Sequence, residues 1–295
     1  MKNLHKTLAI VAIIATLTTG CRSTKDYKKL VEAGNRYAQA VDQLLVTAGN
    51  MKVDDTSEEL LNSRMLLSIK GPLSQEDSEL LENNYRTLSK GDKERLETLS
   101  ELRAHNQLLQ DYFSKLKELA TSDAPDKART EAQGIVGNLT TIGANLKKRL
   151  PNLDVLPGIT SLVIDSKIRG VLREELEQNN QKILEELTIQ QAMLKEVSRE
   201  MEDALKHTTR LQEERLIIQP FIKPDAISDE ESWITTRRKI LLKFTMILAL
   251  KRASEALGKF QEVFQQSLEG KLTTEHLNDV LKTIDLYLSG ILVKE

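Results

Sequence analysis

The stretch "LEQNNQKILEELTIQQAMLKEVSREMEDALKHTTRLQEERLII", residues 176–218, repeats apolar side chains every seven positions. One heptad position, interrupted only by Gln190, holds Leu176, Ile183, Val197, Ala204, Leu211 and Ile218. The companion position holds Leu187, Leu194 and Met201, and is interrupted by Asn180, Thr208 and Arg215. An imperfect seam of this length predicts one long helix in an antiparallel, coiled-coil-like hairpin or at the edge of a bundle.

The segment after Ser228 is the expected partner of this helix. Between Trp233 and Lys259 it carries seven basic residues and one acid, Glu255, whereas residues 165–215 carry twelve acids and nine bases. Opposite charge bias on consecutive helices favours antiparallel packing, with ion pairs beside the apolar seam. We therefore expect these two segments to form the long hairpin.

The rest of the chain has the same helical character. All six prolines lie between segments with helical periodicity, and no run alternates with period two for long enough to require a sheet. Capping boxes at residues 56–59 and 228–231, and Pro125 in a first turn, indicate helix starts. The sequence predicts an all-α, elongated helical bundle, with helices over residues 24–50, 56–69, 74–89, 92–121, 126–150, 159–219, 228–268 and 273–292.

The first residues of the chain are typical of an export signal. "MKNLHK" (1–6) is basic, and the uncharged "TLAIVAIIATL" (7–17) falls far short of the roughly twenty residues that span a bilayer as a helix. "LTTGC" (17–21) then places the only cysteine directly after small residues. This pattern resembles the lipobox of bacterial lipoproteins. The resemblance implies that residues 1–20 are a cleaved signal peptide and that Cys21, the lipidation site, becomes the first residue of the mature chain.

The resemblance also implies a location. Two or three acyl chains, of the palmitate type, would anchor the body stably to a membrane of the bacterial cell envelope. Arg22 follows Cys21, at a place where aspartate tends to retain lipoproteins in the inner membrane. The lipobox resemblance therefore implies the outer membrane, at the periplasm, rather than the inner one. Because there is no second cysteine, the body of residues 21–295 forms no internal disulfide.

Composition and motifs give no sign of catalysis. The chain has 44 acids against 42 bases and few aromatic residues, so nothing suggests a nucleic-acid partner. The histidines after residue 20 belong to no Glu-x-x-His or HExxH motif, and Asp203 with His207 supplies only two metal ligands. Serine-hydrolase and phosphate-loop motifs are absent. We therefore expect neither an enzyme nor a bound metal or cofactor.

Residues 134–164 are unusually poor in charge, with four charged residues among 31. Glycines there lower helix propensity but permit close helix approach. We interpret the tract as a helix and loop inside the bundle, with contact to a partner or a membrane as the alternative; that alternative is similar in architecture to the apolar head of helical pore-forming toxins. The candidate contact residues are Ile135, Val136, Leu139, Ile142, Leu156 and Ile159.

Another apolar run, "ILLKFTMILAL" (240–250), has the length of a core helix rather than of a membrane span. The sequence as a whole predicts an anchored helical scaffold or partner-binding protein, engaging a protein partner or a second copy of itself. The alternative is a membrane-active protein that inserts residues 134–164. We treat residues 21–295 as one body, with a subdivision near 151–158 left open.

Overall fold

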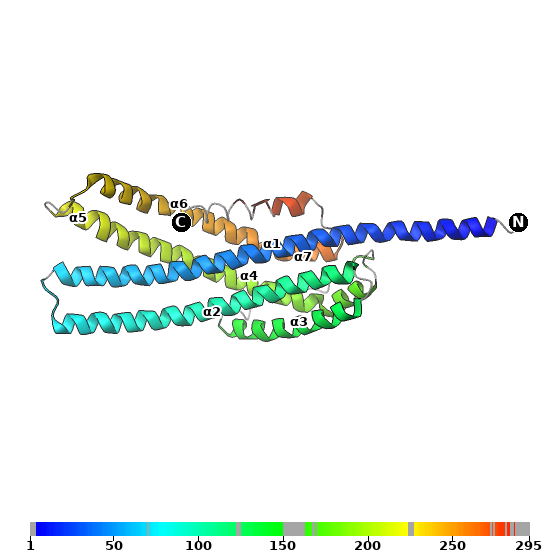
Figure 1. Cartoon of the computed structure of the whole chain (residues 1–295), viewed down its shortest axis with the longest axis horizontal. Coiled ribbons are helices and arrows are strands. Elements are labelled where there is room, and N and C mark those ends of the chain that lie inside the picture. The colour runs from blue at the N-terminus through cyan, green and yellow to red at the C-terminus, as the bar shows by residue number, and fades with distance from the viewer. Residues whose placement is uncertain are drawn as a thin grey trace. The chain divides into compact units, whose positions relative to one another are not determined.

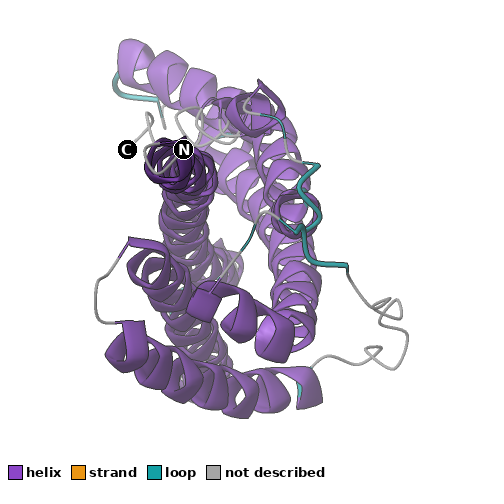
Figure 2. Ribbon diagram, turned by 90° about the vertical axis from the view of Figure 1, so that its right-hand side faces the viewer, coloured by secondary structure: helices purple, strands orange, loops and turns teal. Residues whose placement is uncertain are grey.

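The computed structural model describes residues 4–69, 71–121, 125–149, 163–166, 168, 170–223, 227–271, 273, 275–280, 282–283 and 286, with the side chains of 4–30, 244–254 and 256 excepted. Every regular element among these residues is a helix, and Figure 2 contains no strand in the described parts of the chain. The predicted all-α class is therefore confirmed.

The described part of the chain consists mainly of long helices (Figure 1). In chain order they are α1 (Leu4–Ile69), α2 (Gln75–Thr121), α3 (Pro125–Lys148), α4 (Gly170–Gln212), the π-helix η2 (Glu213–Ile218), α5 (Gln219–Ile222), α6 (Glu230–Gly258) and α7 (Phe260–Leu268).

Several predicted helix boundaries were wrong. The helix predicted over 159–219 begins at Gly170, and the helix predicted over 228–268 is divided into α6 and α7. Elsewhere, two local signals for a break do not interrupt the helix. The capping box expected at residues 56–59 lies inside α1. There the Thr56 hydroxyl bonds to the carbonyl oxygens of Lys52 (3.2 Å) and Val53 (3.1 Å), so it does not cap a new helix. Gly91 lies inside α2, where a glycine costs about 1 kcal/mol relative to alanine without ending the helix.

Other helix starts are as expected from capping chemistry. Ser74 and Asp77 cap α2 reciprocally: Ser74 Oγ accepts from the Asp77 N–H (3.1 Å), and Asp77 Oδ2 accepts from the Ser74 N–H (2.9 Å). Pro125 opens α3, because a first-turn residue needs no backbone donor. At α6 the cap is Asp229, whose Oδ1 accepts from the Ser232 N–H (3.0 Å).

The long helix runs without a break from α4 through η2 and α5, past the predicted end at residue 219. In η2 the Gln219 N–H donates to the Glu214 carbonyl, five residues back, and this wider turn accommodates Pro220, which has no N–H to donate. The heptad seam does not continue through this turn: Ile217 is buried, whereas the predicted seam residue Ile218 is 41% exposed.

Contacts along the backbone divide the chain into two compact units. Unit 1 contains Met1–Gln39, His105–Gln190 and Lys259–Lys282, and unit 2 contains Ala40–Ala104, Gln191–Gly258 and Thr283–Glu295. Each unit is therefore assembled from segments that are distant in sequence. The subdivision considered near residues 151–158 lies outside the described residues and stays a prediction.

An aromatic cluster forms the centre of unit 1. Tyr37 of α1 stacks on Phe260 of α7, with ring centroids 4.2 Å apart. Phe113 of α2 meets Phe260 and Phe264 edge to face, each at 5.6 Å. Edge-to-face and offset pairs of this kind add stability beyond the area they bury. The cluster therefore holds α1, α2 and α7 together.

Unit 2 contains the predicted antiparallel hairpin of the long helix and the helix after Ser228. Three contacts with reversed order along the chain define it: Gln191 Nε2 to the Gly258 carbonyl (3.0 Å), Lys243 Nζ to Gln212 Oε1 (2.8 Å) and Trp233 Nε1 to the Ile217 carbonyl (3.3 Å). Among the described side chains, the ion pairs of the long helix differ from those expected. Arg215 pairs with Glu58 of α1, and Glu200 pairs with Arg95 of α2.

Candidate functional site

Five of the seven residues predicted to carry function lie in α1 and α3. Cys21 is within α1, and its side chain lies outside the described set. In α3, Val136 and Leu139 are buried in unit 1, while Ile135 and Ile142 are half-buried. The remaining two candidates, Leu156 and Ile159, lie outside the described residues. Val136, Leu139, Leu146 and Ile164 of the 134–164 tract thus contribute to the core of unit 1, whereas Val163 of the same tract is 82% exposed.

The glycines of α3 have two different environments. A Cβ atom added at Gly134 or Gly137 would have no atom within 4 Å, so nothing in the described chain requires glycine there. A Cβ at Gly143 would overlap the carboxylate of Glu186 on α4. Close helix approach, which the sequence suggested for all of these glycines, is therefore found at Gly143.

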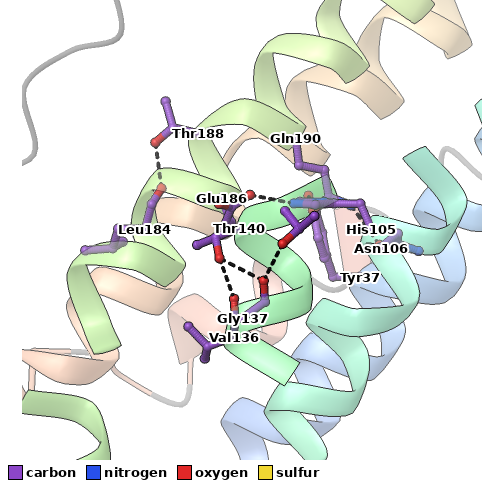
Figure 3. Close-up of polar contacts among 11 residues, drawn as sticks. Tyr37, His105, Asn106, Val136, Gly137, Thr140, Leu184, Glu186, Thr188 and Gln190 are labelled. Carbon is purple, nitrogen blue, oxygen red and sulfur yellow. Dashed lines mark hydrogen bonds and ion pairs between the residues drawn. The ribbon is translucent and has the colours of Figure 1, made fainter. Parts of the chain in front are cut away.

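A network of buried polar side chains connects the helices of unit 1 (Figure 3). The Tyr37 hydroxyl of α1 donates to Gln190 Oε1 of α4 (3.0 Å), and Gln190 Nε2 donates to Asn106 Oδ1 of α2 (2.9 Å). Asn106 Nδ2 then donates to the Ala38 carbonyl of α1 (2.7 Å). Gln190, the residue that interrupts the heptad, is therefore a fully buried junction between three helices.

A second pair in the same region joins His105 of α2 to Glu186 of α4, with Nε2 and Oε2 2.8 Å apart. The His105 side chain is fully buried and Glu186 is 4% exposed. Sequence reasoning noted His105 only as a poor metal ligand and did not find its partner, which is 81 residues further along the chain.

Glu175 of α4 is a third buried polar group of unit 1. Burial raises the pKa of Glu175 above its ordinary value, and the hydrogen bond from Asn179 Nδ2 (2.8 Å), the positive charge of Arg129 and the Tyr112 hydroxyl partly offset that rise. Burial likewise raises the pKa of the Tyr37 phenol, which stays neutral and donates. These buried groups help to specify how the helices pack.

The raised pKa of Glu175 predicts a pH-dependent loss of stability. The folded chain binds this proton more tightly than the unfolded chain does, so ionisation destabilises the fold as pH rises from the ordinary pKa of 4.5 through the raised one. We expect Glu175→Gln to raise the urea midpoint at neutral pH, and the gain to vanish below pH 4.5. Glu185→Gln, an exposed change on the same helix, is the control. A gain that is equal at both pH values would contradict the prediction.

The described residues contain no cluster of three or more potential metal ligands. Within the same part of the chain, no helix is long and apolar enough to cross a membrane. The Asp203 and His207 pair, considered from sequence, is divided: His207 Nδ1 lies 2.7 Å from Asp55 Oδ1 of α1, and Asp203 faces Arg199. His207 is thus paired with a residue of α1, and Asp203 with a residue of its own helix.

Unit 2 has an accessible apolar surface where the ends of two helical hairpins lie side by side. The end of α1, the start of α2, α5 and the start of α6 occupy the same end of Figure 1. None of the described residues between 59 and 97 is buried. Large apolar side chains exposed on the two hairpins include Leu61, Leu66, Ile69, Leu73, Tyr85, Ile218, Phe221 and Ile222.

A groove of about 540 Å³ lies between these hairpins, and we call it the hairpin groove. It is lined by Leu61, Arg64, Met65, Ser68, Leu73, Arg215, Gln219, Pro220 and Lys223. Apolar patches of this kind on soluble chains usually mark interaction surfaces. Sequence reasoning missed the groove, because its two walls come from segments about 150 residues apart and each wall alone resembles an ordinary solvated helix face.

The fold and its polar core define the class of protein as an all-α bundle in which buried hydrogen bonds specify the packing. The chain matches no protein-family model, no curated protein and no solved structure.

Proposed function

We propose that this chain is an acylated lipoprotein of the bacterial cell envelope whose helical body serves as a scaffold that binds a protein partner. The lipobox-like residues 17–21 support the anchor on Cys21. The observation that carries the partner-binding part is the apolar surface at the hairpin ends of unit 2, with Phe221 67% and Ile222 63% exposed. Side chains of this size gain most when another protein covers them.

The membrane-active alternative has less support. It requires residues 134–164 to enter lipid, but Val136 and Leu139 are 3% and 0% exposed within unit 1. Exposing two such side chains costs several kcal/mol in lost burial, at roughly 1.5–3 kcal/mol for each. We therefore keep the scaffold as the proposed function.

The anchor is tested by replacing Cys21 with alanine in a diderm bacterial host. We expect the wild-type protein to fractionate with membranes, with an intact mass that starts at residue 21 and includes two or three acyl chains. The Cys21→Ala variant should lose the acyl mass and nearly all membrane retention, because no other residue accepts the diacylglyceryl group. Ser23→Ala, two residues further on, should behave as wild type.

The same strains test partner binding. A photoreactive residue at Leu66, on the exposed hairpin end, should crosslink to one defined envelope protein, whereas the same residue at Thr130 on α3 should not. An unmodified mass with residues 1–20 attached would overturn the lipoprotein assignment. Equal crosslinking at both positions would overturn the assignment of the partner surface to unit 2.

A further inference from the structure

The walls of the hairpin groove are two helical stripes. On α1 the lining residues Leu61, Arg64, Met65 and Ser68 follow the spacing i, i+3, i+4 and i+7, which is one face of a helix. The opposite wall has Arg215 of η2, Gln219 of α5 and Lys223, the extended residue that follows α5. The α1 stripe extends over about two turns, or roughly 10 Å. A helical wall of this length matches the face of another helix.

One end of the groove is closed by a buried ion pair. The Arg215 guanidinium donates to both carboxylate oxygens of Glu58 on α1, at 3.0 and 2.7 Å, and Gln212 Nε2 donates to the same carboxylate (2.9 Å). Glu58 is only 8% exposed, so this pair joins the two walls firmly. Leu73, in the connection between α1 and α2, also lines the groove. The contacts between Glu58, Gln212 and Arg215 thus fix the two walls relative to each other.

The charges that line the groove have a single sign. Its ionisable lining residues are Arg64, Arg215 and Lys223, all basic. Glu58 neutralises Arg215, which leaves the exposed side chains of Arg64 and Lys223 as the net charge of the groove. An occupant that fits the groove therefore presents carboxylates on either side of an apolar stripe.

We infer that the hairpin groove binds an amphipathic, acidic helix of a protein partner. Its apolar face would contact Leu61, Met65 and Leu73, and its flanking carboxylates would pair with Arg64 and Lys223, as in other helix-in-groove complexes. A volume of about 540 Å³ accommodates the side chains along one face of such a helix. The inference rests on the proposed partner-binding function and specifies the chemistry of the partner segment that binds.

A membrane surface fits these charges less well. The first turns of α2 and α6, which begin at the same end of unit 2, carry the acids Glu76, Asp77, Glu230 and Glu231. These acids would face the anionic headgroups of a bilayer that approached the hairpin ends, and like charges repel. A helix seated inside the groove instead meets ionisable lining residues that are all basic.

The test uses the full chain with Cys21→Ser, produced without export, so that acylation has no influence on the result. The probes are a synthetic amphipathic peptide of about 18 residues (five turns) with a leucine stripe and glutamate flanks, the same peptide with lysine flanks, and a scrambled glutamate peptide. Trp233 is the only tryptophan and stacks on Phe221 beside the groove at 5.7 Å, so its emission reports binding.

Of the three peptides, we expect only the one with the leucine stripe and glutamate flanks to bind saturably. Light scattering should show that the protein is a monomer. Reversing Arg64 and Lys223 to glutamate should weaken that binding about tenfold or more and let the lysine peptide bind. Leu73→Asn, in the turn and 38% exposed, should weaken it without changing helix content. The matched reversals Lys90→Glu and Lys93→Glu, exposed on α2 outside the groove, should leave it unchanged.

Three outcomes would overturn the inference: no saturable binding, equal binding of the lysine or scrambled peptide, or unchanged affinity after the Arg64 and Lys223 reversals. A Trp233 response to phosphatidylglycerol vesicles but not to peptide would assign the surface to membrane, and dimerisation through the groove would assign it to a second copy.

Acylation of Cys21 and crosslinking at Leu66 are measured separately, so the proposed function can stand when the groove inference fails.

Discussion

Phe113→Ala will lower the free energy of unfolding by about 3–5 kcal/mol, because it removes a fully buried ring from the centre of unit 1. Phe113 contacts Phe260 and Phe264 edge to face, so the substitution removes both aromatic contacts and leaves a cavity between α2 and α7. Urea unfolding followed by circular dichroism measures the loss. Tyr85→Ala, on the same helix but 59% exposed, should change the free energy of unfolding by less than about 0.5 kcal/mol.

Gly34 of α1 provides a sharper version of this prediction. A Cβ at Gly34 would lie 2.6 Å from Phe113 Cδ2, so Gly34→Ala should destabilise the wild type. In the Phe113→Ala background that ring is gone, and alanine at residue 34 should stabilise the helix and reduce the cavity. We expect the double variant to be more stable than Phe113→Ala alone. Simple addition of the two single losses would contradict the close contact between α1 and Phe113.

The seam of residues 176–218 explains why the fold class and the long hairpin could be predicted. Leu176, Ile183 and Val197 are each at most 1% exposed, because a repeat of seven keeps them on one face of a helix whatever the rest of the chain does. The seam residue Ala204 is only half-buried, and the pattern fails in η2, where turns wider than 3.6 residues change the face of Ile217 and Ile218.

The candidate sites were less predictable, because their partners are remote in sequence. Gln190 was identified as a break in the seam, but the hydroxyl that donates a hydrogen bond to its side chain belongs to Tyr37, 153 residues away. The hairpin groove likewise depends on Leu61 and Gln219 facing each other. Periodicity assigns a residue to a face of its own helix, but not to the helix that this face meets.

Helix boundaries were missed for a related reason. The "TSEE" run at residues 56–59 and the glycine at residue 91 are both weak local preferences of about 1 kcal/mol. Tertiary contacts exceed them: Thr56 Oγ1 bonds to Asp92 Oδ2 across to α2 at 2.7 Å, and Glu58 binds Arg215. Because these contacts need α1 to stay helical through residue 58, the predicted break at 51–55 does not form.

Glu186→Ala will destabilise unit 1 by about 1–3 kcal/mol, because it leaves the fully buried His105 ring without its hydrogen-bond partner at 2.8 Å. Equilibrium unfolding in urea measures the effect. Replacing both residues by leucine should recover most of the loss, since an apolar pair of similar volume needs no partner. Glu185→Ala, the exposed neighbour of Glu186, should have an effect below about 0.5 kcal/mol.

Gly143 allows the position of the Glu186 carboxylate to be tested directly. In the wild type, Gly143→Ala should destabilise strongly, because the new Cβ would overlap that carboxylate. With Glu186→Ala the carboxylate is absent, and alanine at residue 143 should instead add helix propensity and occupy part of the space left behind. The substitution at Gly143 is therefore expected to change sign between the two backgrounds. The same sign and size in both, within about 0.5 kcal/mol, would show that Glu186 does not lie against α3.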